Sequence, residues 1–73
     1  DRYCYVIASL STRAEAERYV AARAADGVDL RILDNAGRFR VYAASGSSSA
    51  SLRRIVAEAG LDSRYPGAWI CRR

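Results

Sequence analysis

Apolar and polar side chains alternate along residues 37–43, Gly-Arg-Phe-Arg-Val-Tyr-Ala. A two-residue period is typical of a strand with one buried face and one open face. The apolar side carries Phe39, Val41 and Ala43, and the other side carries Arg38, Arg40 and Tyr42. Two guanidinium groups and a phenol do not form an apolar layer, so the sequence predicts that this second face is wet or binds a ligand.

The chain has 73 residues. A domain of this size buries only about 60% of its unfolded surface, which suffices for two layers. No stretch approaches the roughly 20 apolar residues of a membrane helix, and no signal peptide is recognisable. We therefore expect residues 1–73 to be a single domain, excised from a longer protein.

The first half of the chain predicts a strand and then a helix. Tyr3–Leu10 is rich in aromatic and β-branched residues and predicts a strand. Ser11 and Thr12 are N-cap residues, and Glu15 completes a capping-box pattern with Thr12. Helix formers occupy residues 13–25, and Asp26-Gly27 ends the predicted helix because glycine tolerates the left-handed C-cap conformation.

Two further strands follow the first helix. Residues 28–33 alternate again between apolar and polar positions, which predicts a strand. Asp34-Asn35-Ala36-Gly37 then supplies hairpin turn chemistry. The second and third strands are therefore expected to be antiparallel neighbours.

The last third of the chain predicts a helix and a short final strand. Residues 45–49 are expected to form a loop and an N-cap. Gly60 ends the helix, residues 62–66 are expected to form a loop, and residues 67–71 are apolar and β-prone. The apolar stripe of this helix consists of Leu52, Ile55, Val56 and Ala59.

The element order strand-helix-strand-strand-helix-strand predicts an α+β fold of the βαββαβ, ferredoxin-like or RNP-like type. Its four-stranded antiparallel sheet has the first and third strands in the centre and both helices on one face. The helix side is expected to carry Tyr5, Ile7, Leu30, Ile32, Phe39, Val41, Ala43, Ala68 and Ile70. The open side is expected to carry Val6, Arg31, Arg38, Arg40, Tyr42 and Trp69.

The residue types favour a binding module over an enzyme. The chain has no histidine, no nucleophile-elbow serine and no glycine-rich phosphate loop. Two cysteines without CxxC spacing do not make a zinc site, so neither metal nor cofactor is expected. The net charge is +4 and all 12 basic residues are arginine, which suits an anionic partner. Solubility and genome composition explain the same charge equally well.

Cys4 and Cys71 lie in the first and last predicted strands. In an antiparallel pair they come level on the same face, where a cross-strand disulfide is sterically possible. Such a bond implies an oxidising compartment, either the bacterial periplasm or an extracellular space. Two unpaired cysteines near the chain ends remain the alternative.

The pieces Tyr3–Leu10, Asn35–Val41 and Pro66–Ile70, at their spacing, resemble the SPOR (sporulation-related repeat) domain over essentially all 73 residues. The resemblance implies the same βαββαβ fold and binding of bacterial peptidoglycan on the open sheet face. The ligand implied is denuded glycan, from which amidases have removed the stem peptides at division septa. Family members are attached to cell-division proteins, lytic transglycosylases or amidases in the cell envelope, and some have a disulfide between the first and last strands.

The chemistry of denuded glycan agrees with the residues of the predicted open face. Arginine binds the freed lactyl carboxylates, and aromatic rings receive sugar faces and amides. Ser9 corresponds to a serine in the first strand of the family and is expected to donate a hydroxyl. For Trp69, packing over the sheet edge is the alternative role. The predicted glycan-binding residues are Ser9, Arg31, Arg38, Arg40, Tyr42 and Trp69.

Two other functions compete with carbohydrate binding. The βαββαβ order also belongs to RNA-recognition modules, and residues 37–42 faintly resemble their central-strand signature. However, those modules place aromatic rings outward, whereas Phe39 shares the inward side of Val41, so no nucleic-acid partner is expected. A protein-protein interaction domain with a basic sheet face is the second alternative.

Overall fold

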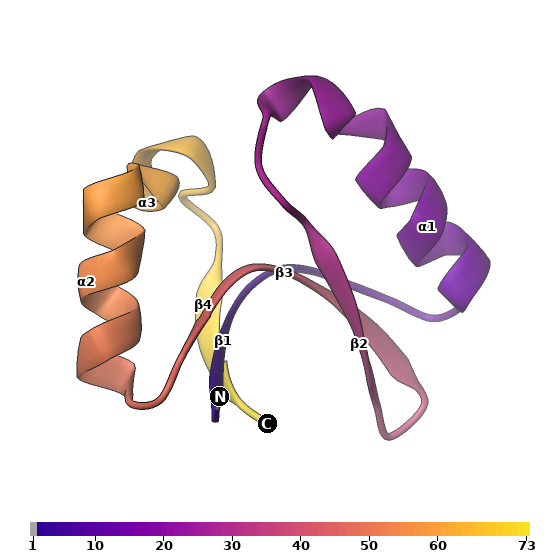
Figure 1. Ribbon diagram of the computed structural model, residues 1–73. Coiled ribbons are helices and arrows are strands. Elements are labelled where there is room, and N and C mark those ends of the chain that lie inside the picture. Colours follow the sequence, from indigo (N-terminus) through magenta and orange to yellow (C-terminus); the bar gives the residue numbers. More distant parts are fainter. Residues whose placement is uncertain (1) are drawn as a thin grey trace.

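The computed structural model describes residues 2–73. The chain forms β1 (Tyr3–Leu10), α1 (Arg13–Ala22), the 3-10 turn η1 (Ala24–Asp26), β2 (Arg31–Asn35), β3 (Arg38–Gly46), α2 (Ser49–Ala59), α3 (Leu61–Arg64) and β4 (Trp69–Arg72). The strands form one sheet in the order β2-β3-β1-β4, and every neighbouring pair is antiparallel (Figure 1). The predicted α+β class, with its central first and third strands, is confirmed.

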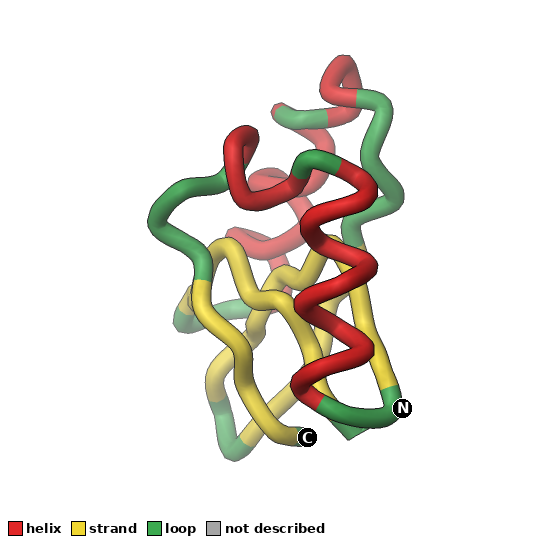
Figure 2. The backbone as a smooth tube through the Cα atoms, turned by 90° about the vertical axis from the view of Figure 1, so that its left-hand side faces the viewer, coloured by secondary structure: helices red, strands yellow, loops and turns green. Residues whose placement is uncertain are grey.

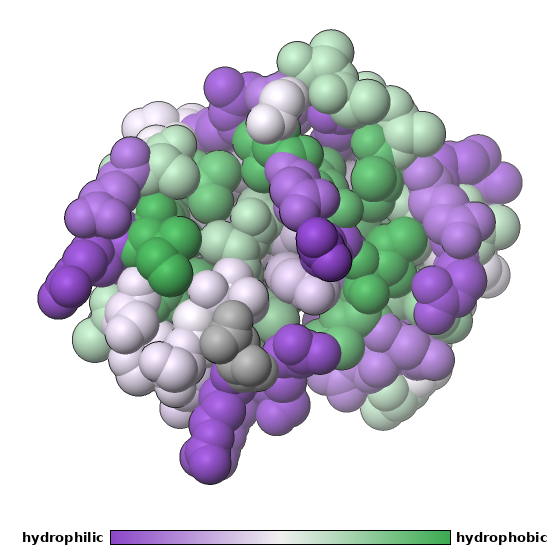
Figure 3. All heavy atoms as spheres, viewed as in Figure 1, coloured by the Kyte–Doolittle hydropathy of each residue, from purple (hydrophilic) through white to green (hydrophobic). Residues whose placement is uncertain are grey.

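The main core lies between the sheet and the second pair of helices. Tyr5 of β1 packs with Leu52 and Val56 of α2 and with Leu61 of α3. On α1 the side chain of Ala16 is fully buried, and this small residue lets the helix lie close to the sheet. In Figure 2 the strands occupy the lower part of the molecule, with helical segments in front of and above them, and in Figure 3 hydrophobic areas alternate with hydrophilic side chains, most of which lie at the rim.

The start of α1 is capped as the sequence predicts. The Thr12 hydroxyl accepts a hydrogen bond from the Glu15 backbone N–H at 3.1 Å. The Ser11 and Thr12 hydroxyls also donate to the Glu15 carboxylate, at 2.7 Å and 3.1 Å. These bonds favour the charged form and lower the pKa of Glu15. Gly27, with a φ of 72°, lies in the left-handed region and ends the helical segment.

Several element boundaries differ from the predicted ones. α1 ends at Ala22 and continues as a 3-10 turn, and β2 begins at Arg31 rather than at residue 28. β3 extends to Gly46, into the segment predicted as a loop. A Cβ atom on Gly46 would lie 3.0 Å from the backbone nitrogen of Leu52, so the glycine lets β3 pass directly against α2.

The predicted loop at residues 62–66 is wrong in its first half. Leu61–Arg64 forms the short helix α3, and Leu61 is 5% exposed. Ile55, predicted as part of the buried stripe of α2, is 40% exposed. Leu61 follows the αL turn at Gly60 and packs in the cluster with Leu52 and Val56, so the core is filled from α3 instead.

A polar contact joins the two helical regions. The Tyr65 hydroxyl donates to the Asp26 carboxylate at 3.0 Å, and Arg64 donates to the Asp26 carbonyl oxygen at 3.1 Å. Burial and the bond to Asp26 raise the pKa of Tyr65. The 3-10 turn η1, which follows α1, is thereby held next to the segment that leads into β4.

The hairpin between β2 and β3 has a two-residue loop of Ala36 and Gly37. Their φ angles are 54° and 84°, so both residues lie in the left-handed region. This pattern is that of a type I′ turn, in which asparagine is favoured over alanine at the first position. We expect Ala36→Asn to raise the free energy of unfolding by about 0.5–1 kcal/mol, measured by urea denaturation.

Ala36→Val is the contrasting variant for the hairpin. A β-branched residue is disfavoured at positive φ, so this change lowers the free energy of unfolding. Equal stability of the asparagine and valine variants would contradict the assigned turn geometry.

Candidate functional site

One row of side chains crosses all four strands on the open face of the sheet. Arg31 of β2 is opposite Tyr42 of β3, Tyr42 is opposite Val6 of β1, and Val6 is opposite Trp69 of β4. Directly opposed residues share a face of a sheet. The row therefore brings three of the predicted site residues together with Val6 between them.

The other predicted site residues occupy the next rows of the same face. Ser9 is opposite Arg40, and Arg38 lies two residues before Arg40 on β3. Arg38 reaches across to β1, where its Nε donates to the Ser9 hydroxyl at 3.2 Å and its Nη2 donates to the Ser9 carbonyl oxygen at 3.0 Å. All six predicted residues thus lie in adjacent rows of one surface.

The sheet bends toward this open face. The Arg40 Nη1 donates to the Cys71 sulfur. On β1, Arg40 is paired with Ser9 and Cys71 is paired with Cys4, and these two β1 residues are five positions apart. A flat strand would separate two such positions by about 16 Å. The register of β1 against β3 shifts on both sides of Val6, and such bulges bend strands. The bend of β1 and β3 is visible in Figure 1.

Val6 lies in the open-face row, as predicted, but it is not exposed to solvent there, because its side chain is fully buried. β1 lies between β3 and β4, so the Arg40 side chain passes over β1 to reach Cys71. The centre of the open face is therefore covered by its own arginine. The Arg40 Nε is buried and makes no hydrogen bond within the described residues. A ligand group that accepts from this atom would satisfy it.

Cys4 and Cys71 are directly opposite each other, as the predicted strand pairing requires. Both are free thiols in this structure, so the disulfide remains a prediction. Cys4 is fully buried, and burial raises the pKa of its thiol.

Arg31 occupies the β2 end of the row. It forms an ion pair with Asp29 at 3.0 Å, with both side chains exposed, so the pair adds little stability and opens easily. The hydrogen bond to Asp29 raises the pKa of Arg31. A hollow of about 360 Å³ lies here and is lined by Asp29, Arg31, Tyr42 and the following residues of β3.

A second hollow, of about 490 Å³, lies at the opposite edge of the sheet. Trp69, which is 43% exposed, lines it together with Arg53 of α2 and Asp62 of α3. Sequence reasoning did not identify Arg53 or Asp62. Arg53 directly follows the buried Leu52, so the sequence places it beside the apolar stripe of α2. The hollow itself forms only because β4 lies at the edge of the sheet, and the sequence pattern of α2 does not contain this information.

Residues 2–73 contain no cluster of three or more potential metal-ligating side chains. Within the same residues, no helix is long and apolar enough to cross a membrane.

The family model of the SPOR domain matches residues 1–72. SPOR domains are peptidoglycan-binding modules of the bacterial cell envelope and are associated with cell division. No curated protein and no solved structure matches the chain significantly. The family match covers nearly the whole chain, and the predicted strand order agrees with the structure. The chain belongs to the SPOR-domain family.

Proposed function

We propose that the open sheet face binds denuded glycan strands of peptidoglycan at the division septum. The observation that carries this proposal is the row Arg31-Tyr42-Val6-Trp69 with Ser9, Arg38 and Arg40 beside it. A surface with arginines, an exposed tryptophan and a half-buried tyrosine in adjacent rows suits a polymer that alternates sugar faces with carboxylates.

Each residue type has a separate task in this proposal. Trp69, exposed at one end of the row, receives the apolar face of a sugar ring. Arg38 is held against β1 by Ser9, so its guanidinium is positioned before the ligand arrives and loses little freedom on binding. Arg40 offers a fork to a lactyl carboxylate when it exchanges its contact with Cys71 for the ligand.

Removal of the stem peptide creates the carboxylate that these arginines bind. A lactyl group that carries a peptide ends in a neutral amide, whereas the denuded lactyl group is an anion. Charge-assisted hydrogen bonds to arginine are about twice as strong as neutral ones. The proposed face therefore binds denuded strands more tightly than peptide-bearing strands. This preference directs the domain to the septum, in the periplasm. The parent protein would then act in cell division or cell-wall remodelling.

The RNA-binding alternative is disfavoured by the position of Phe39. Arg13 of α1 lies over the Phe39 ring, 5.2 Å from its centroid, so the ring faces the helices. RNA-recognition modules stack bases on aromatic rings of the open face. Among the open-face residues here, the aromatic residue on a central strand is the half-buried Tyr42 of β3, and the exposed Trp69 is on the edge strand β4.

The test is sedimentation of the domain with peptidoglycan sacculi, before and after amidase treatment, at two salt concentrations. We expect the bound fraction to rise after amidase treatment. We expect it to fall with salt less steeply than binding to RNA would, because salt screens the arginine–carboxylate contacts but not the stacking on sugars. Absence of binding to both preparations would overturn the proposal, and a steep loss with salt together with RNA binding would replace it with the nucleic-acid function.

Variants of the open face test the residues themselves. We expect Trp69→Ala and Arg40→Ala each to weaken binding to amidase-treated sacculi by at least tenfold, because each removes a contact of the order of 1.5–3 kcal/mol. Arg18→Ala, an exposed arginine of α1, is the matched control for the change in net charge. Thermal melts establish that each variant is folded. Unchanged binding of both open-face variants would refute the site.

A further inference from the structure

The hollow at the edge of the sheet shares one residue, Trp69, with the open face. Trp69 is opposite Val6 in the four-strand row, and it also lines the 490 Å³ hollow with Arg53 and Asp62. β4 is an edge strand, so no further strand separates the two surfaces. A linear ligand that lies on Trp69 can therefore extend past the edge into the hollow.

The charges in this hollow are not paired with each other. The ion pairs formed by residues 2–73 are Arg31–Asp29 and Arg64–Asp26, so Arg53 has no carboxylate partner there. The Asp62 carboxylate accepts a hydrogen bond from the Ser63 backbone N–H at 2.9 Å through one oxygen. The hollow thus offers an exposed guanidinium and a carboxylate oxygen on an apolar floor that includes Val56 and Ile70.

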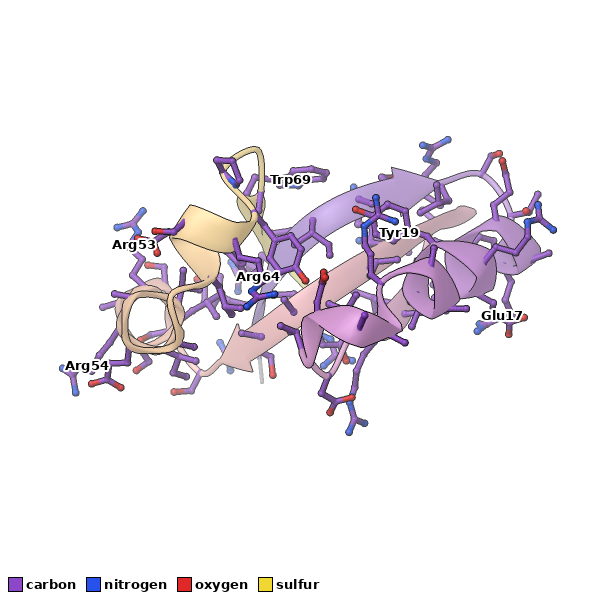
Figure 4. All side chains as sticks on the ribbon, turned by 90° about the horizontal axis from the view of Figure 1, so that it is seen from above. Glu17, Tyr19, Arg53, Arg54, Arg64 and Trp69 are labelled. Atoms are coloured by element: carbon purple, nitrogen blue, oxygen red, sulfur yellow. The ribbon has the colours of Figure 1, made fainter. Side chains whose placement is uncertain are left out.

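This combination matches the chemistry of a sugar that carries an acid. Arginine forks bind carboxylates in two places at once, carboxylates such as Asp62 accept bonds from sugar hydroxyls, and the apolar floor contacts ring C–H groups. The volume lies in the range usual for small-ligand sites. In Figure 4 the Arg53 side chain lies on the same side of the molecule as Trp69, whereas Arg54 points away.

We propose that the hollow is a second glycan subsite, in which Arg53 binds the lactyl carboxylate of the sugar that follows the one stacked on Trp69. This inference rests on the proposed function and extends it. The two sugar sites lie on either side of strand β4. The affinity should therefore depend on glycan length, because only a glycan that extends from Trp69 past β4 reaches Arg53.

The experiment measures binding of denuded oligosaccharides of graded length by calorimetry, for the original chain and for Arg53→Ala and Arg54→Ala. Arg54→Ala is the matched control. Arg54 is the next residue on α2 and is also exposed, and its replacement by alanine also removes one positive charge. We expect Arg53→Ala to weaken binding of the longest glycan about tenfold and to leave binding of a monosaccharide without a lactyl group unchanged, because such a sugar has no carboxylate for Arg53 to bind. Arg54→Ala is expected to change neither.

A chemical control uses long glycan whose lactyl carboxylates are converted to amides. The difference between the original chain and Arg53→Ala is expected to vanish on this ligand, because the group that Arg53 binds is neutral. Equal losses for Arg53→Ala and Arg54→Ala, or no loss at any length, would overturn the subsite while binding by the original chain keeps the proposed function. Failure of the original chain to bind any glycan would overturn both.

Discussion

Oxidation of Cys4 and Cys71 to a disulfide is expected to raise the free energy of unfolding by about 4 kcal/mol. The two residues are direct cross-strand partners, and such positions in an antiparallel pair have Cα atoms at a separation that a disulfide spans. The bond would close a loop from the first strand to the last, so it restricts most of the unfolded chain. For a domain of this size the melting temperature rises by roughly 15 °C or more.

The order of the thiol chemistry follows from burial. With oxidised glutathione as oxidant, the half-buried Cys71 attacks one glutathione sulfur and releases one glutathione thiol. Cys4 then attacks the mixed disulfide at Cys71 and releases the second. Burial raises the pKa of Cys4, so its thiolate is scarce and the second step is slow at neutral pH. The bond also takes the Cys71 sulfur from Arg40, which leaves that guanidinium free for a ligand.

Thermal melts of oxidised and reduced protein check this prediction, with mass spectrometry to confirm the loss of two hydrogens. Cys71→Ser is the control, because it keeps a small polar side chain at this position and cannot form the bond. A melting temperature that is the same for oxidised and reduced protein would contradict the predicted stabilisation.

Local patterns were sufficient to predict the strand order and the faces of the sheet. The alternation in residues 37–43 placed Arg38, Arg40 and Tyr42 on the open side, and the capping pattern at Thr12 and Glu15 is present as expected. These features depend on the backbone period and on contacts within four residues, which a single sequence contains.

Features that depend on contacts between distant residues were not predictable. Val6 alternates like an exposed residue, but a bend in the sheet and the side chain of Arg40 bury it. The bulges on either side of Val6 have no glycine or proline to mark them. The hydrogen bond of Arg38 to Ser9 and the hollow beside Arg53 likewise require the relative positions of whole elements.

Leu52→Ala is expected to lower the free energy of unfolding by about 2–5 kcal/mol. Leu52 is fully buried and packs with Tyr5, Val56 and Leu61. The backbone of β3 at Gly46 already lies against Leu52, so the surroundings have little room to collapse into the space left behind. Total stability of a domain this small is of the order of 4–11 kcal/mol, so the loss is a large fraction of it.

Ile55→Ala tests whether the apolar stripe of α2 or its observed packing decides stability. Sequence periodicity places Ile55 on the same stripe as Leu52, but the structure leaves it 40% exposed. We expect a loss of less than about 1 kcal/mol for Ile55→Ala by urea denaturation, because little apolar area returns to water. Leu52→Val, with an expected loss of about 1 kcal/mol, gives a measurable value should Leu52→Ala fail to fold. Similar losses for Ile55→Ala and Leu52→Ala would mean that α2 is rotated relative to the sheet, with Ile55 in the core.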